Sequence, residues 1–356
     1  MTERTTNIMQ RPLRTTAAIG ALGALVLGLG AFRYSGWADT ASKQAGARAT
    51  TWLKTKQQSD GGFEVAGFAG FETPDAIEAI AENEQRQSSW NTSQALAAVN
   101  ATVSHGHSPL HYMDNYVDAG VNAGQAAKVI VLVVKPLGLN PADFDPDHDG
   151  GKVNLRNIVV AGKKSDGTYG TFNDTLYAMI ALHSMGVTVA PATLTAVRKA
   201  QEASGGWDFA GSATATDADT DTTSVAIEAL VAAGVSPTDA TVHKGLGYLA
   251  KQYHTATGAW QSFGDDDPNS TASAVLAITA SGYDPASRCW RDKSAPSLAT
   301  QAYHSPLGWL RSQQVSNGRV KSPSDQFGVN TFATSQTIES WRRQFLPLAT
   351  AAKQPC

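Results

Sequence analysis

Two aspartates separated by a single residue, Asp219 and Asp221, begin an apolar, Ala-rich segment that ends at Gly234. Two carboxylates this close in an apolar setting cannot easily both ionise, so one can keep its proton at neutral pH and act as a general acid. The same residues also suit a structural role, because an Asp side chain can accept hydrogen bonds from the N–H groups of a first helical turn. Asp174 and Asn269 stand at like positions before two other apolar segments. This repetition favours the interpretation of Asp221 as a helix N-cap.

A second set of carboxylates alternates along a segment that reads D-F-D-P-D-H-D-G-G. Asp145, Asp147 and Asp149, followed by Gly, match the first half of a calcium-binding loop, in which alternate carboxylates converge on a hard cation. The twelfth position of the loop is Arg156, where calcium loops need a bidentate Glu. Two interpretations stay open: a calcium site, or a solvated acidic connector that caps the next helix.

The segment that precedes Asp39 has the composition of an export signal. Three arginines come before the apolar run Ala17–Phe32, which is short for a membrane span and typical of a signal-peptide core. Gly36 and Ala38 offer small residues for cleavage before Asp39. We therefore expect residues 1–38 to be a signal peptide, with an uncleaved N-terminal anchor as the alternative, and the protein to be secreted or extracytoplasmic.

Export would place the two cysteines, Cys289 and Cys356, in an oxidising setting. An even count outside the cell predicts one disulfide, which would tie the C-terminal tail 349–356 to the segment around Cys289; two free thiols are the alternative. Two distant cysteines lack the ligand spacing of a zinc site. The net charge of −3 gives no sign of a nucleic-acid partner.

The elements that must position these residues repeat along the chain. Apolar helices open at a small residue and close at a Gly, and several openings recur at a constant interval. We expect six of them, opening at Thr92, Ala127, Thr175, Thr223, Thr271 and Thr334. An amphipathic helix precedes each one, joined by a Gly-containing turn that usually carries an aromatic: Phe63, Tyr169, Trp207 or Trp260.

A helix that is apolar nearly all round belongs inside a fold. Six helix pairs can bury their apolar helices by closing into a ring. The sequence therefore predicts an all-α protein, an α6/α6 toroid over residues 39–348, with six inner and six outer helices. The turn aromatics are interpreted as packing between neighbouring pairs rather than as ligand contacts.

The motif Gln201-x-x-x-Gly205-Gly206-Trp207 resembles the QW repeat of squalene–hopene cyclases and related terpenoid cyclases. The chain is similar to exported bacterial proteins with prenyltransferase/squalene oxidase repeats. Their superfamily also includes protein prenyltransferase β subunits and transcobalamin-type carriers. The resemblance covers about residues 41–348 and implies the α/α toroid. It says less about function, because one fold hosts unrelated activities.

One function that the resemblance implies is capture of a hydrophobic or polycyclic small molecule, corrinoid-like by kinship with the carriers. Those carriers hold their ligand with a second small domain, so here a partner protein or a membrane transporter would supply the second wall. A single ring, an export signal and the lack of a nucleophile triad favour this function. The expected ligand-binding residues lie at one rim of the ring: Trp90, Phe172, Asp219, Asp221 and Phe332.

The alternative is a class II terpene cyclase-like enzyme. Asp219-Thr220-Asp221-Thr222-Thr223 resembles a D-x-D-T-T variant of the acid motif of such enzymes, which implies that Asp221 is the proton donor and Asp219 its partner. Aromatic side chains would stabilise the carbocation. The length for only one ring, the export signal and the repeated capping pattern count against this function.

Overall fold

A computed structural model describes residues 39–65, 68–85, 90–323, 331–343 and 353–356, and the predicted export signal lies outside them. The regular secondary structure of the described residues is helical except for one short hairpin, β1 (Trp260–Ser262) with β2 (Asp265–Asp267). None of its helices combines the length and the apolar character needed to cross a bilayer. The prediction of an all-α fold is confirmed.

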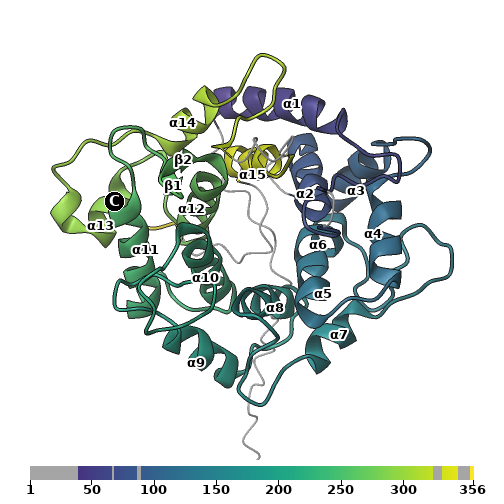
Figure 1. The fold of residues 1–356 in the computed structure, drawn as a ribbon, viewed down its shortest axis with the longest axis horizontal. Helices are drawn as coiled ribbons and strands as arrows, with labels where there is room; N and C mark the ends of the chain where they lie inside the picture. Colours follow the sequence, from purple (N-terminus) through teal and green to yellow (C-terminus); the bar gives the residue numbers. More distant parts are fainter. Residues whose placement is uncertain (1–38, 66–67, 86–89, 324–330, 344–352) are drawn as a thin grey trace, which may run out of the picture.

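The helices form a closed ring of two layers (Figure 1). The inner layer consists of α2 (Thr73–Glu84), α5 (Ala123–Val129) continued by η1 (Ile130–Val134) and α6 (Lys135–Leu137), α8 (Phe172–Ser184), α10 (Thr220–Ala232), α12 (Pro268–Ala280) and α15 (Thr331–Arg342). The outer layer contains α1 (Thr40–Lys54), α4 (Pro109–Asp118), α7 (Leu155–Ala161), α9 (Pro191–Lys199), α11 (Ala240–Gln252) and α14 (Pro306–Ser312). Two short elements, α13 (Cys289–Ser294) and η2 (Pro296–Leu298), lie between α12 and α14.

The first inner helix is α2, and the prediction that it opens at Thr92 is wrong. The helix from Thr92, α3 (Thr92–Asn100), lies outside α2 and buries only Ala95 and Val99. A repeated hydrogen bond identifies the true equivalent, because the Thr73 hydroxyl accepts the N–H of Phe63 at 3.0 Å. Thr223 accepts the N–H of Trp207 at 3.0 Å in the same way.

The repeated geometry of the turns comes from a glutamine that joins neighbouring pairs. Gln201 Nε2 donates to Gly205 O at 2.8 Å and to Thr241 O of the next outer helix at 2.9 Å. Gln314 Nε2 donates to Gly318 O and, at 2.9 Å, to Ala45 O. Since Ala45 belongs to α1, this last link joins the final pair to the first and closes the ring.

Glycine is required where these turns approach the next helix. Gly205 has a φ of +96°, which disfavours any residue with a Cβ. A Cβ at this position would also lie 2.6 Å from Lys244 O of α11. The Q-x-x-x-G-G-W motif is therefore a contact between repeats, in which Gln supplies the hydrogen bonds and Gly the close approach.

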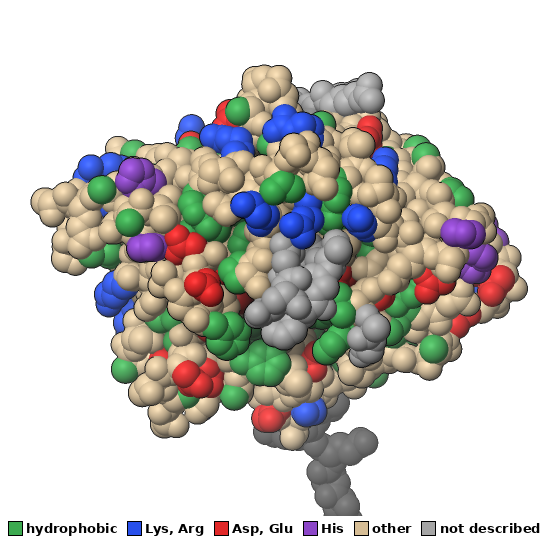
Figure 2. Space-filling view, turned by 45° about the horizontal axis from the view of Figure 1, so that its top comes forward, with side chains coloured by type: hydrophobic (Ala, Val, Ile, Leu, Met, Phe, Trp, Pro, Cys, Tyr) green, Lys and Arg blue, Asp and Glu red, His purple; other side chains and the backbone are tan. Residues whose placement is uncertain are grey.

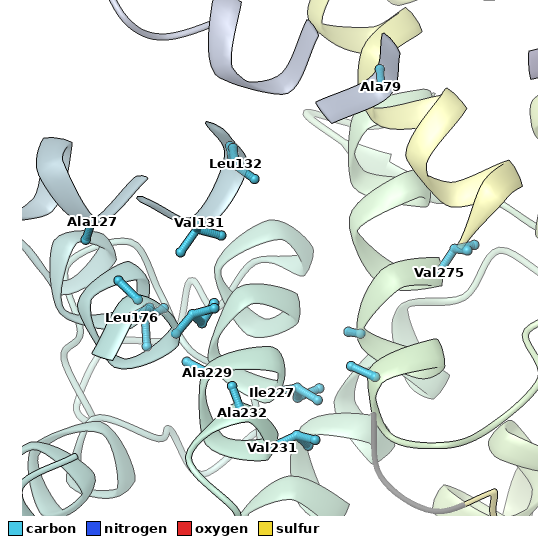
Figure 3. Close-up of a cluster of buried hydrophobic side chains, with 14 of the residues drawn as sticks. Ala79, Ala127, Val131, Leu132, Leu176, Ile227, Ala229, Val231, Ala232 and Val275 are labelled. Atoms are coloured by element: carbon cyan, nitrogen blue, oxygen red, sulfur yellow. The ribbon is translucent and has the colours of Figure 1, made fainter. Parts of the chain in front are cut away.

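Tryptophans and aliphatic residues fill the space between the layers. Trp207 and Trp260 are fully buried, and their indole N–H groups donate to Val197 O and Leu249 O, each at 2.8 Å. This confirms the packing role of these two turn aromatics. Figure 3 shows aliphatic side chains of successive inner helices close together, among them Leu176 and Ala229.

The predicted disulfide between Cys289 and Cys356 is present, with the two Cα atoms 5.6 Å apart. The tail is also held through its main chain, because Gln354 N donates to Gly282 O at 2.8 Å. The bond thus fastens the end of the chain to the segment that follows α12.

Candidate functional site

The two aspartates at the start of α10 have different roles. Asp219 is the N-cap: one carboxylate oxygen accepts the N–H of Thr222 at 2.6 Å and the other accepts its hydroxyl at 2.8 Å. The interpretation of Asp221 as the cap is wrong, because the helix begins at Thr220 and places Asp221 inside its first turn. Asp221 turns instead toward α12, where Ser270 Oγ donates to its Oδ2 at 3.1 Å.

The Asp221 carboxyl is accessible to solvent although protein atoms pack closely around it. Its side chain is exposed, so water reaches the carboxyl. Protein nevertheless surrounds it, and this loss of solvation, followed by the negative charges of Asp219 and Asp267, raises its pKa above the ordinary value. A hydroxyl bond from Ser270 opposes the shift. The group is a carboxyl that holds its proton more strongly than a free Asp and can still be approached from outside.

The beginnings of the six inner helices adjoin one another, so that they form one rim of the ring. Asp221 of α10 meets Ser270 of α12, and Asn269 Nδ2 of α12 donates to Gln336 Oε1 of α15 at 3.1 Å. Thr331 of α15 donates to Phe63 O, just before α2, at 3.1 Å. Lys128 of α5 reaches Phe71 O at 2.6 Å. Hereafter, the term helix-start rim denotes this edge.

The exposed phenylalanines of the described residues all stand in segments that lead into inner helices: Phe68 and Phe71 ahead of α2, Phe209 ahead of α10, and Phe263 ahead of α12. Phe71 also packs on Phe332 at the start of α15, with ring centroids 4.8 Å apart. Lys128 Nζ lies 4.9 Å from the centroid of the Phe71 ring, within the range of a cation–π contact. In the space-filling view, apolar side chains also gather near the middle of the face shown, among acidic ones (Figure 2).

A second feature of the ring is acidic. Glu78, Glu228 and Glu339 each lie five positions after a threonine of the inner-helix pattern, namely Thr73, Thr223 and Thr334, and all three are buried. Their helices are α2, α10 and α15, and Figure 1 places α2 and α10 on opposite sides of the centre. Glu78 could not be recognised as part of this repeat from the sequence, because the pattern predicts that the first inner helix opens at Thr92 rather than at Thr73.

Burial keeps these interior carboxyls protonated. Loss of solvation raises the pKa of Glu228 to about 8. It also raises the pKa of Glu78, with further contributions from Glu82, Asp75 and Glu228, and that of Glu339, with Glu78 as the next cause. Because the charge of Glu228 on α10 contributes to the raised pKa of Glu78 on α2, across the ring, we infer that both face the ring interior.

Asp75 is an interior acid with a cationic neighbour. Its Oδ2 lies 3.0 Å from Lys128 Nζ, and both side chains are largely buried. The pair stands where the helix-start rim meets the interior, beside the Phe71 and Phe332 rings. The site therefore offers an apolar edge, one buried ion pair and neutral acids further in.

Four of the five predicted ligand-binding residues lie on the helix-start rim. Phe332 contacts Phe71, Asp219 and Asp221 open α10, and Phe172 packs on Gly211 of the loop ahead of α10. Trp90 does not join them. It precedes α3, and its indole N–H donates to Pro136 O, near the far end of an inner helix, at 2.8 Å.

The predicted calcium residues form a separate cluster in the outer part of the ring. Asp145, Asp147 and Asp149 come together with a fourth carboxylate, Asp114 of α4. Asp114 was missed because it stands far before the acidic loop in the chain. The available signal was its helical spacing: His111, Asp114 and Asp118 fall on one face of α4.

No family model matches this chain, and no curated protein does either. Solved structures do match. The type II terpene cyclase MstE from Scytonema, without ligand, superposes with a TM-score of 0.57 at 13% identity, covering 85% of this chain and 97% of that one. A variant of MstE in complex with geranylgeranyl dihydroxybenzoate gives 0.57 at 11% identity, with the same coverage. A protein from Actinoplanes gives 0.55 at 15%, covering 85% and 98%.

At these identities the likeness shows the fold alone. The chain has an α/α toroid similar to that of MstE and of the Actinoplanes protein, as its repeats predicted.

Proposed function

We propose that the ring binds a hydrophobic, prenyl-derived or polycyclic small molecule at the helix-start rim. The observation that carries the proposal is the group formed at this rim by exposed Phe71 with Phe68 and Phe332, whose ring centroids lie 6.4 Å and 4.8 Å from that of Phe71. Exposed apolar side chains that gather in one place, rather than scatter singly, are typical of a binding surface. The MstE structure with a geranylgeranyl compound supports the choice of ligand, since that ring has a similar fold.

Binding can be measured through the intrinsic fluorescence of the tryptophans, with geranylgeraniol and a corrinoid as the two probes. We expect saturable binding of the prenyl alcohol, weakened about tenfold by Phe71→Ala. Val160→Ala is the matched control, because Val160 is an exposed apolar residue on the outer helix α7. Equal loss in both variants, or no saturable binding of either probe, would contradict the proposal. Tighter binding of the corrinoid than of the prenyl alcohol would indicate a corrinoid-like ligand, like that of the transcobalamin-type carriers.

A second function, cyclisation started by a proton, is favoured by Asp221 itself. Its carboxyl does not cap the helix, Ser270 donates to its Oδ2, and its raised pKa favours the protonated form. In this step the π electrons of an alkene form a C–H bond with the Asp221 proton, the electrons of the broken O–H bond stay on the Asp221 carboxylate, and the other alkene carbon becomes a carbocation. A neighbouring alkene then attacks this carbon, and the cyclised cation loses a proton to water.

The length of the chain does not exclude this second function. The match covers 97% of MstE and 85% of this chain, so one ring of this size is enough for that cyclase. The length for only one ring therefore does not count against a cyclase.

Asp221→Asn separates binding from catalysis. Incubation with farnesyl and geranylgeranyl diphosphate should yield cyclised product from the unchanged protein if Asp221 is the acid. Loss of the acidic proton should then reduce turnover by a factor of at least about 100. Asp217→Asn, at an exposed residue of the same loop, is the control. Prenyl alcohol binding without any cyclised product would leave capture as the function.

We further propose that the ligand is met outside the cytoplasm and that a membrane transporter or a second wall-forming protein completes the site. The composition of residues 1–38 supports this setting. N-terminal sequencing of protein recovered from the culture medium would test it. A start at Asp39 is expected, and full retention in the cytoplasm would contradict it.

A further inference from the structure

Four carboxylates from two parts of the chain meet beside α4. Asp145, Asp147 and Asp149 lie on the connection between α6 and α7, and Asp114 comes from the second turn of α4. One oxygen from each lies within 4.8 Å of the others. Two oxygens on opposite sides of a Ca²⁺ ion, each bonded at about 2.4 Å, would be about 4.8 Å apart. The four oxygens are therefore close enough to bind one ion together.

The observation that points to a ligand is the state of Asp114. Its side chain is only 1% exposed, and its Oδ1 has no hydrogen-bond partner among the described residues. The buried Oδ1 of Asp145 likewise has none within the part of the chain that the structure describes. A buried carboxylate oxygen without a donor loses its solvation and gains nothing in return. A cation between these two oxygens would remove that deficit.

We propose that Asp114, Asp145, Asp147 and Asp149 form a calcium site. Asp114 takes the place of the acidic ligand that the loop lacks at its twelfth position, where the chain has Arg156. The ligand thus comes from a preceding helix instead of from the end of the loop. The bound ion fastens the outer helix α4 to the connection that leads into α7.

The donor set favours calcium over other metals. All four ligands are carboxylate oxygens, which suit hard cations, and neither cysteine can supply a thiolate because both are in the disulfide. A loop of alternating carboxylates adapts to the larger and more variable shell of Ca²⁺, whereas Mg²⁺ demands a near-ideal octahedron. His111 Nδ1 lies 2.7 Å from Asp147 Oδ2, so it orients a ligand rather than binding the metal.

Isothermal titration of the chelator-treated full chain with CaCl₂, and separately with MgCl₂, tests the site. We expect one Ca²⁺ per chain, bound at least tenfold more tightly than Mg²⁺, and a higher Tm in Ca²⁺. Asp149→Asn, at an exposed ligand, and Asp114→Asn should each abolish both effects. Asp143→Asn is the matched control, because Asp143 stands at the same loop but pairs with Lys152 at 3.2 Å.

A second acidic group, Glu202 with Asp208 and Asp217, supplies the competing outcome. If Ca²⁺ binding survives in Asp149→Asn and is lost in Asp217→Asn, the ion binds there and the proposal is overturned. It is also overturned if the unchanged protein shows no binding heat and no change in Tm. Loss of binding in Asp149→Asn, with its Tm in chelator unchanged, establishes the site even if Asp114→Asn fails to fold.

Discussion

The ring contains two sets of buried acids, and the cost of burying their negative charge is offset differently in each set. In the interior, Glu78, Glu228 and Glu339 stand on three separate helices, and burial raises the pKa of each, which favours the neutral, protonated form. Beside α4, four aspartates bring one oxygen each to within 4.8 Å. Spacing makes the difference. Among the described residues, the oxygens of the three glutamates do not come together as those of the four aspartates do, so only the aspartates can bind one ion together.

The interior acids make stability depend on pH, and this is the largest effect that we expect. The pKa of Glu228 in the folded chain is about 8, above the unfolded value of 4.5. The unfolded chain therefore releases this proton first as the pH rises. The stabilisation is complete below pH about 4.5 and is lost as the pH rises through about 8.

Glu228→Gln keeps the shape of the neutral acid and cannot ionise. Between pH 5 and pH 9, urea unfolding should show a fall in the free energy of unfolding that is smaller in this variant by on the order of 3 kcal/mol. Asp265→Asn, in the exposed turn of the hairpin, should reproduce the slope of the unchanged protein. An identical slope in Glu228→Gln would show that the interior acids are ionised and solvated.

The loop acids should respond in opposite directions with and without metal. Burial and the neighbouring Asp147 raise the pKa of Asp114 to about 8, so at pH 9 without metal the fold holds a costly negative charge. Asp114→Asn should then raise the free energy of unfolding by about 1–2 kcal/mol. In millimolar Ca²⁺ the same change should lower it, because a ligand is lost. Urea unfolding under both conditions measures the reversal, and the same sign in both would refute it.

Asp219 is stabilised by hydrogen bonds rather than by a proton or a metal ion. Of these substitutions, its replacement should have the smallest effect on stability. Backbone N–H and hydroxyl donors satisfy it at the start of α10. Asp219→Ala should cost about 1 kcal/mol of unfolding free energy, and Asp219→Asn only a few tenths, because Asn keeps a capping oxygen. Thermal unfolding of both variants measures this. Equal losses would mean that charge, rather than capping, is what matters there.

The sequence was sufficient for the ring but not for its first helix. Repeats report local pairing, and the Gln–Gly–aromatic turn repeats because every pair must contact the next in the same way. Thr73 escaped detection because the spacing from turn aromatic to threonine varies: Tyr169 closely precedes Thr175, whereas Trp207 stands much further before Thr223. That variation lies in surface loops, which packing does not constrain.

The site residues were partly predictable for a similar reason. Asp219 and Asp221 were identified together, but which one caps depends on where the helix begins, and boundaries are the least certain feature of a sequence pattern. Asp114 could be recognised only once the fold placed α4 beside the loop. The buried glutamates required the correct alignment of α2 with α10 and α15.

The closure of the ring also sets the order in which the molecule can be completed. Gln314 bonds Ala45 across 269 positions, and Arg311 pairs with Asp39 across 272. During synthesis, the early pairs must therefore wait with an uncovered flank until α15 emerges and fills the gap between α12 and α2. Contacts this distant along the chain form slowly. Premature arrest of translation would leave an open arc in which the surfaces of α2 and α12 that α15 normally covers stay exposed. Such an arc would be prone to associate with other copies of the chain.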